Sequence, residues 1–111
     1  MYFHNLKDVQ YKKKREGVYF KSITGDSSQL TIIKLDPGVT TEHSHINEQM
    51  GYILSGKMEL MIDNKIKVLE KGDGYYIPSN MIHGFKVLGK EPLEYIEIFT
   101  PPKKENFQYD K

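Results

Sequence analysis

The chain has 111 residues, a formal net charge of +1 and no cysteine. This length suits one domain with a modest core, and the near-neutral charge, with Arg15 as the only arginine, argues against a nucleic-acid partner. The absence of cysteine excludes disulfides, thiolate metal sites and cysteine nucleophiles, so any metal must be held by histidine, carboxylate or amide oxygen.

The N-terminal segment, residues 1–16, lacks the apolar core of a signal peptide, and no apolar run in the chain approaches membrane-spanning length. We therefore expect a soluble, cytoplasmic protein with no membrane partner. The segment is expected to pack on the following domain or on a dimer partner. The charge run at 11–17 is typical of a solvated face or of a guarded sheet edge.

Short strands separated by tight turns are predicted for residues 17–100. The expected strands cover residues 17–23, 29–35, 49–56, 57–62, 65–70, 75–78, 83–89 and 92–99. Asp63-Asn64 is typical of a two-residue hairpin turn, and no window shows a sustained helical period. Strands of this length and spacing indicate an all-β sandwich or barrel. Residues 101–111 are expected to form a tail that lies over the barrel or frays.

Two stretches, residues 38–56 and 72–83, hold three of the four histidines. His43 and His45 are two residues apart, so in a strand they would share a face, which is the geometry that two metal ligands need. Gln49 has the same parity, although a turn through residues 46–47 would shift it. In isolation, His83 would more commonly be a half-buried polar residue. The case for a metal site therefore rests on the two stretches together.

The two stretches resemble the paired motifs of the cupin superfamily, over about residues 30–99. The first motif is matched by Gly38, His43, His45, Gln49 and Gly56, and the second by Gly72, Pro78, Asn80 and His83. The gap after Gly38 is one residue shorter than usual, Gln49 stands where glutamate is common, and Asn80 replaces a glycine, which asparagine tolerates in the left-handed region. The resemblance implies a jelly-roll β-barrel with one divalent transition metal (Ni, Zn, Mn, Fe or Co). The implied ligands are His43, His45, Gln49 and His83.

Glu48 competes with Gln49 as the oxygen ligand. Gly56 follows Gln49 by seven residues, as the motif requires, and parity with His45 also favours Gln49. Glu48 is therefore assigned a supporting polar or surface role. Three neutral imidazoles and a neutral amide would leave a divalent cation with its full charge, so the site is expected to act as a Lewis acid and to attract an anionic or oxygen-rich substrate.

The strand expected at residues 92–99 presents two alternatives. One face carries Leu93, Tyr95, Glu97 and Phe99, and the other carries Glu94, Ile96 and Ile98. If the first face lines the cavity, Glu97 lies near the metal among apolar neighbours. If the second face forms the core, Glu97 is exposed, and the residues alone leave both arrangements open.

Residues 43–56 and 97–107 resemble a cupin subfamily described as pectin-degradation proteins, which linearise the unsaturated uronates released by pectate and alginate lyases. The ending is matched by Glu97, Phe99, Thr100 and Pro101, followed by Lys103 or Lys104 where that group typically has arginine. The resemblance implies isomerase- or lyase-type opening or tautomerisation of a uronate ring, with Glu97 moving the proton and Lys103 or Lys104 holding the substrate carboxylate. Tyr52, Tyr95 and Phe99 are further substrate-binding candidates, although packing in the core or rim is the commoner role of an aromatic residue in a small barrel.

Two other functions fit the same residues. An Fe-dependent dioxygenase-type cupin would use the open coordination positions for oxygen, and a non-catalytic cupin would bind a sugar or metabolite without turnover. The resemblance also implies a homodimer, across which Tyr2, Phe3 and Tyr11 of the N-terminal segment would pack.

Overall fold

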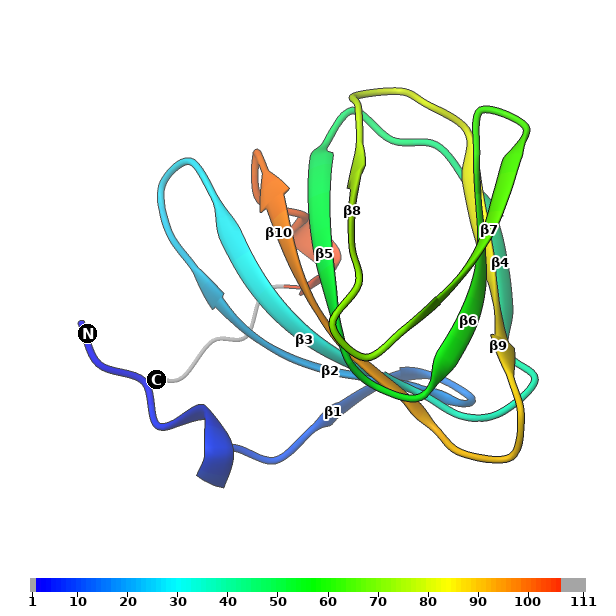
Figure 1. Cartoon of the computed structure of the whole chain (residues 1–111). Helices are drawn as coiled ribbons and strands as arrows, with labels where there is room; N and C mark the ends of the chain where they lie inside the picture. The colour runs from blue at the N-terminus through cyan, green and yellow to red at the C-terminus, as the bar shows by residue number, and fades with distance from the viewer. Residues whose placement is uncertain (1, 107–111) are drawn as a thin grey trace.

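The computed structural model describes residues 2–106; residue 1 and residues 107–111 of the expected tail lie outside the described residues. Within this range the chain forms ten strands and two short 3₁₀ helices (Figure 1). The strands are β1 (Lys12–Arg15), β2 (Val18–Thr24), β3 (Gln29–Leu35), β4 (Thr40–His43), β5 (Glu48–Ser55), β6 (Lys57–Ile62), β7 (Lys65–Glu70), β8 (Gly74–Ile77), β9 (His83–Leu88) and β10 (Leu93–Thr100). The helices are η1 (Leu6–Asp8) and η2 (Lys104–Asn106).

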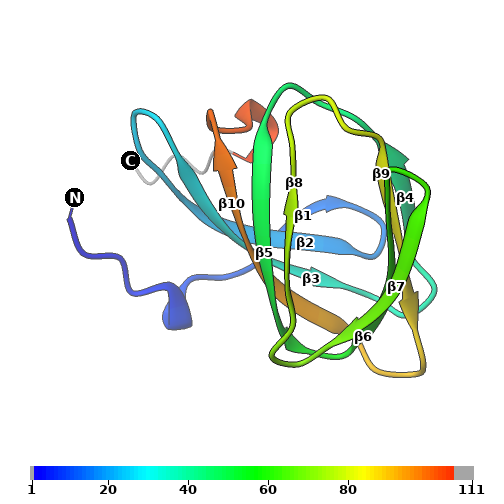
Figure 2. The same ribbon diagram turned by 45° about the horizontal axis from the view of Figure 1, so that its top comes forward.

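The strands form two antiparallel sheets that face each other across the barrel interior (Figures 1 and 2). The larger sheet has the order β1-β2-β3-β10-β5-β8, and the smaller has the order β4-β9-β6-β7. No residue from 2 to 106 lies in an α-helix. The predicted all-β jelly-roll barrel is therefore confirmed.

Alternation of buried and partly buried residues along β10 decides which of its faces is inside. The buried face carries Leu93, Tyr95, Glu97 and Phe99. Glu97 is only 3% exposed, although a carboxylate is rarely buried without partners. Of the two arrangements that the sequence leaves open, the structure has the one with Glu97 inside the barrel.

The interior divides into two halves along β10. At the start of the strand, Leu93 and Tyr95 lie opposite the apolar residues Leu35, Ile33 and Ile53. Towards its end, Glu97 and Phe99 lie opposite Thr31, Gln29, Gly51 and Gln49. One half is thus a packed apolar core, and the other collects buried polar groups that need partners.

Two short polar turns adopt the backbone that their residues favour. Asp63 and Asn64 have φ values of 50° and 65°, as a type I′ hairpin turn between β6 and β7 requires. Asn80 has a φ of 65°, so asparagine does occupy the left-handed position where the family motif has glycine.

The N-terminal segment contacts the larger sheet just before β1. Lys21 of β2 donates to the carbonyl of Val9 at 3.3 Å and lies 4.7 Å from the ring centroid of Tyr11. Tyr2 and Phe3 are 86% and 94% exposed, and the N-terminal end of the chain extends away from the barrel (Figure 1). Neither of the helices found in residues 2–106 has the length and apolar character that crossing a membrane requires.

Candidate metal centre and catalytic pocket

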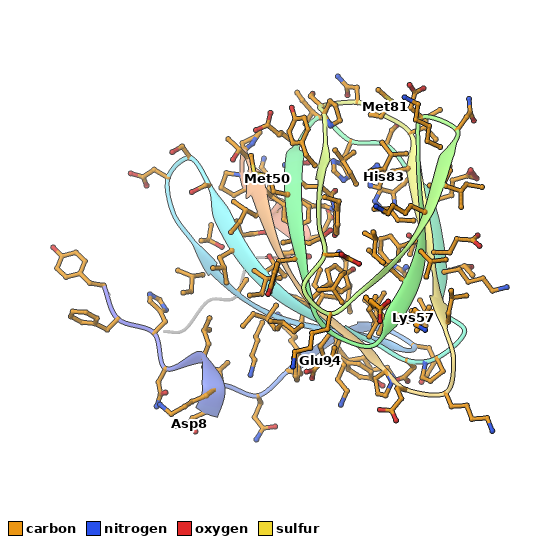
Figure 3. All side chains as sticks on the ribbon, in the orientation of Figure 1. Asp8, Met50, Lys57, Met81, His83 and Glu94 are labelled. Atoms are coloured by element: carbon orange, nitrogen blue, oxygen red, sulfur yellow. The ribbon has the colours of Figure 1, made fainter. Side chains whose placement is uncertain are left out.

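Three histidines converge at one end of the barrel. His43 ends β4 and lies opposite His83, the first residue of β9, whereas His45 lies in the loop between β4 and β5. Their ring centroids are 4.5 to 5.2 Å apart, and one ligand atom from each lies within 4.8 Å of the others. Figure 3 shows the His83 side chain directed from β9 into the barrel. The two motifs therefore meet, although a loop, and not strand alternation, places His45.

Hydrogen bonds determine which nitrogen of two of these rings is available. Nδ1 of His45 lies 2.8 Å from the carbonyl of Asn47, and Nδ1 of His83 lies 2.9 Å from the carbonyl of Met81. Because a carbonyl only accepts, each Nδ1 donates and each Nε2 keeps its lone pair. Within residues 2–106, both Nε2 atoms and Oε1 of Gln49 are buried without a hydrogen-bond partner. Buried polar atoms nearly always have partners, so these three acceptors fit a bound cation.

A buried carboxylate holds the side chain of Gln49. Nε2 of Gln49 donates to Oε2 of Glu97, and the hydroxyl of Tyr75 donates to the same oxygen. Since the amide nitrogen is engaged by Glu97, the amide oxygen of Gln49 is left for the cation site. Both of these donors reach Oε2, which leaves Oε1 of Glu97 for a ligand in the barrel.

A glycine allows Tyr75 to reach Glu97. Tyr75 of β8 pairs with Gly51 of β5, which pairs in turn with Glu97 of β10. A Cβ at Gly51 would collide with Cζ and the hydroxyl oxygen of Tyr75, so only glycine lets the ring cross this strand. Tyr75 is not among the residues that the sequence indicates. A glycine inside an expected strand was the available signal, but the identity of its neighbour depends on tertiary strand pairing.

Burial sets the charge of the groups at this end of the barrel. It raises the pKa of Glu97 to about 7, although the hydrogen bond from Tyr75 acts in the opposite direction. Burial, followed by the proximity of His83, lowers the pKa of His43 to about 4. Burial is also the main cause of the lowered pKa of His45 and of His83. The imidazoles therefore stay neutral, as metal ligands must be, to pH values below the ordinary 6.5.

A cavity of about 60 Å³ lies inside the barrel beside Glu97. Three of the expected substrate-binding residues, Tyr95, Phe99 and Lys103, line it. Nζ of Lys103 lies 5.2 Å from the ring centroid of Phe99. Thr41 also lines the cavity, and its buried Oγ1 has no partner within the described residues. This hydroxyl is therefore available to a ligand in the cavity, and the sequence did not point to Thr41.

Two expected substrate-binding residues lie elsewhere. Tyr52 is 49% exposed because strand alternation turns it to the outer face of β5. Lys104 is exposed at the start of η2 and does not line the cavity, since Lys103 takes the inward position. Glu48 accepts a hydrogen bond from the hydroxyl of Tyr76 at 2.9 Å, in line with the surface role assigned to it.

Strand β1 contributes two cations that the sequence analysis does not place at the site. Lys14 and Arg15 line the cavity with His43 and Lys103. They also line its mouth, a hollow of about 270 Å³. The sequence alone indicates a solvated face or a guarded sheet edge for this charge run. The strand is indeed the edge of the larger sheet, but its last two residues border the site.

Comparisons with sequences of known proteins agree with this geometry. Residues 31–99, more than half of the chain, match the cupin domain family Cupin_2. The pectin degradation protein KdgF of Dickeya dadantii (strain 3937) is 27% identical over 99 residues, which cover 86% of this chain and 89% of that protein. A mannose-1-phosphate guanylyltransferase of Escherichia coli (strain K12) is 30% identical over 84 residues, covering 74% of this chain but 18% of the enzyme.

Solved structures with the same fold cover nearly the whole chain. KdgF from Halomonas sp. superimposes with a TM-score of 0.86 at 23% identity, covering 96% of this chain and 98% of its own. An RmlC-like cupin from Shewanella frigidimarina NCIMB 400 has the same TM-score of 0.86 at 21% identity, covering 95% of each chain. At these identities the structures establish a shared fold.

Proposed function

The chain belongs to the cupin domain family, and from this premise we propose that it is a metal-dependent enzyme that opens or tautomerises an unsaturated uronate or a related sugar acid. The observation that carries the proposal is a buried carboxylate, Glu97, directly beside a set of unpartnered nitrogen and oxygen acceptors. The similarity to a pectin degradation protein over most of both chains supports the substrate class.

The residues that would hold the metal are His43, His45, Gln49 and His83. Nitrogen and oxygen donors suit Ni, Zn, Mn, Fe or Co. A divalent cation at this position would act as a Lewis acid towards substrate oxygens, and its neutral ligands would leave its charge undiminished. The hydrogen bonds at Nδ1 of His45 and His83 fix both rings for this role before any cation binds.

Glu97 is the proposed proton carrier. A pKa of about 7 suits a group that must both accept and release a proton near neutral pH. Ring opening needs both directions, because a proton leaves the anomeric hydroxyl as the ring C–O bond breaks and a proton is added to the former alkene carbon. Tyr75 and Gln49 hold Oε2 of the carboxylate, so its Oε1 is the proposed reacting atom.

The remaining cavity residues would bind and orient the sugar acid. Phe99 and Tyr95 offer apolar walls, and Tyr95 is itself fixed by edge-on packing against Phe85, with ring centroids 5.8 Å apart. Lys103 would pair with the substrate carboxylate above Phe99. Tyr52 and Lys104 have no part in this arrangement.

The test is incubation of the metal-supplied protein with unsaturated monouronates, following the loss of absorbance of the ring alkene. We expect loss of absorbance with wild type, and none with His45→Ala or Glu97→Ala. Glu94→Gln, on the outer face of the same strand, is the matched control and should react as wild type does. Unchanged absorbance with wild type would overturn the proposal. Oxygen consumption would then indicate the Fe-dependent dioxygenase, and saturable binding of the uronate alone a non-catalytic cupin.

We also propose that the protein is a homodimer formed through the outer face of the larger sheet. Met50, Tyr52 and Tyr76 are 52%, 49% and 49% exposed there, and Ile96 lies beside Tyr52 on the neighbouring strand. Tyr2 and Phe3 remain exposed for contacts with a partner, whereas Tyr11 already packs on Lys21 of its own chain. Sedimentation should give a dimer for wild type and a monomer for Met50→Glu; a monomeric wild type would contradict the proposal.

A further inference from the structure

An irregularity in β1 changes the direction of its last side chains. In the pairing with β2, Lys12 lies opposite Phe20 and Lys13 opposite Tyr19, but Arg15 lies opposite Val18. The register shifts between Lys13 and Arg15, which leaves Lys14 as the extra residue of a β-bulge. In a regular strand Lys14 and Arg15 would point to opposite faces, whereas here both line the cavity and its mouth.

The bulge brings three cations together over the histidines. Lys14 and Arg15 from β1 meet Lys103, which follows β10, although the two segments are far apart in sequence. Burial, followed by the charge of Lys103, lowers the pKa of Lys14, as expected where like charges are crowded. Lys14 is held there by Asn106, whose Oδ1 accepts from its Nζ at 2.9 Å.

Among residues 2–106, one carboxylate, that of Glu105, forms ion pairs with this group of cations. Oε1 of Glu105 lies 3.0 Å from Nζ of Lys103 and 3.6 Å from Nζ of Lys14. Within residues 2–106, Arg15 makes no ion pair. Glu105 is 56% exposed, and ion pairs that solvent reaches contribute little to stability, so an incoming anion can take its place.

We propose that Lys14, Arg15 and Lys103 form a binding subsite for the carboxylate of a small organic acid, and that Glu105 occupies these cations when the subsite is empty. The proposal rests on the proposed function only for the identity of the acid as a uronate. The planar guanidinium of Arg15 offers the two parallel donors that a carboxylate accepts, which lysine cannot offer.

The subsite is tested first by binding, without turnover. Galacturonate and its neutral counterpart galactose are titrated into the purified full chain, and chemical-shift changes are followed by NMR. We expect galacturonate to bind about tenfold more tightly than galactose, because a charged hydrogen-bond pair contributes roughly this much. Raising the salt concentration should weaken the binding of galacturonate alone.

Variants assign the effect to the two cations of β1. Arg15→Gln and Lys14→Gln should each raise the Kd for galacturonate about tenfold and leave that for galactose unchanged. Glu105→Gln should lower the Kd for galacturonate, because it removes the internal competitor. Lys13→Gln, one residue before the bulge and paired with Glu16, is the matched control and should change neither affinity. Thermal melting of each variant checks that the barrel still folds.

The outcomes separate this inference from the proposed function. Equal affinity of wild type for the two sugars, an unchanged Kd in Arg15→Gln, or weaker binding in Glu105→Gln would overturn the subsite. If galacturonate binds as expected but unsaturated uronates are not consumed, the subsite stands and the proposed reaction fails. If unsaturated uronates are consumed by Arg15→Gln with the KM of wild type, the reaction stands and the subsite fails.

Discussion

The two halves of the barrel interior are built by the same strand alternation but carry different residues. Along β10, Leu93 and Tyr95 lie opposite apolar residues, whereas Glu97 and Phe99 lie opposite polar residues and Gly51, where the cavity is bordered by histidine, glutamine and lysine. The backbone pattern is continuous across both halves, so the fold itself does not distinguish them. The candidate site therefore depends on which side chains point inward near one end, while the other end supplies the apolar packing that stabilises the barrel.

The largest effect is expected from removing a histidine of the polar half. His83→Ala should lower the affinity for divalent metal more than about 100-fold, because it removes a fixed Nε2 that is buried without a partner. Isothermal titration with Zn²⁺ and Co²⁺ would measure this change. His4→Ala, in the exposed N-terminal segment, serves as the control. If His83→Ala binds metal as tightly as wild type, the polar half is not the metal site.

The next largest effect is expected from Glu97→Gln, which keeps the shape of the side chain but cannot carry a proton. Activity on the unsaturated uronate should fall about 100-fold or more, the usual contribution of a positioned acid–base group. Metal affinity should change much less, because the amide oxygen introduced at position 97 can still accept the hydrogen bond from Nε2 of Gln49. Steady-state kinetics and metal titration of one preparation test both statements, and loss of both properties together would assign Glu97 a structural role only.

The same variant tests the buried charge through the pH dependence of stability. The pKa of Glu97 is raised from 4.5 to about 7 in the folded chain, so the folded state binds the extra proton between these values. Its contribution to stability is present below pH 4.5 and is lost as the pH rises to 7. The free energy of unfolding of metal-free wild type, measured against Glu97→Gln, should therefore fall by on the order of 3 kcal/mol across this range. A flat difference would contradict a neutral, buried Glu97.

A substitution in the apolar half should lower the free energy of unfolding and leave the affinity for metal unchanged. Ile53 is fully buried beside Tyr95, and Ile53→Ala should destabilise the protein by roughly 2–5 kcal/mol, because the cavity left behind closes incompletely. Urea unfolding measures the loss. Zn²⁺ affinity of the fraction that remains folded should equal that of wild type. A large drop in affinity would mean that the two halves are coupled.

A smaller effect is expected where Tyr75 fixes Glu97. Tyr75→Phe removes one donor to Oε2 and should lower kcat about tenfold with little change in KM or metal affinity. Gly51→Ala should have a similar or larger effect, since its Cβ displaces the ring. Tyr76→Phe, the neighbouring tyrosine whose hydroxyl bonds Glu48 outside the barrel, should behave as wild type. Equal kcat values for the two phenylalanine variants would deny Tyr75 a positioning role.

The site residues that could be predicted from the sequence are those that stand at fixed spacings along the chain. The His43/His45 pair, Gln49 and His83 stand at motif distances, and the structure brings them together. The residues alone placed Glu97 only up to a choice of face, since period-two alternation fits both faces of β10 when each carries apolar residues. The resemblance to pectin-degradation proteins implied the inward face. Short strands and turns indicated an all-β sandwich or barrel, and the resemblance to cupins implied the jelly-roll barrel.

The residues that could not be predicted depend on pairing between distant strands. Tyr75 reaches Glu97 only because β8 and β10 flank β5 in register at Gly51. Lys14 and Arg15 reach the cavity through a bulge that nothing in the local charge run marks. Tyr52 illustrates the reverse case, in which a suitable residue type on the correct strand has the wrong parity.

Anomalous X-ray diffraction from crystals grown with excess Zn²⁺ or Co²⁺ tests the central claim most directly. The account predicts one cation with Nε2 of His45, Nε2 of His83 and a nitrogen of His43 at about 2.0–2.2 Å, and Oε1 of Gln49 completing the set. Crystals in which these atoms have no cation between them, or in which the cation lies elsewhere on the chain, would contradict it.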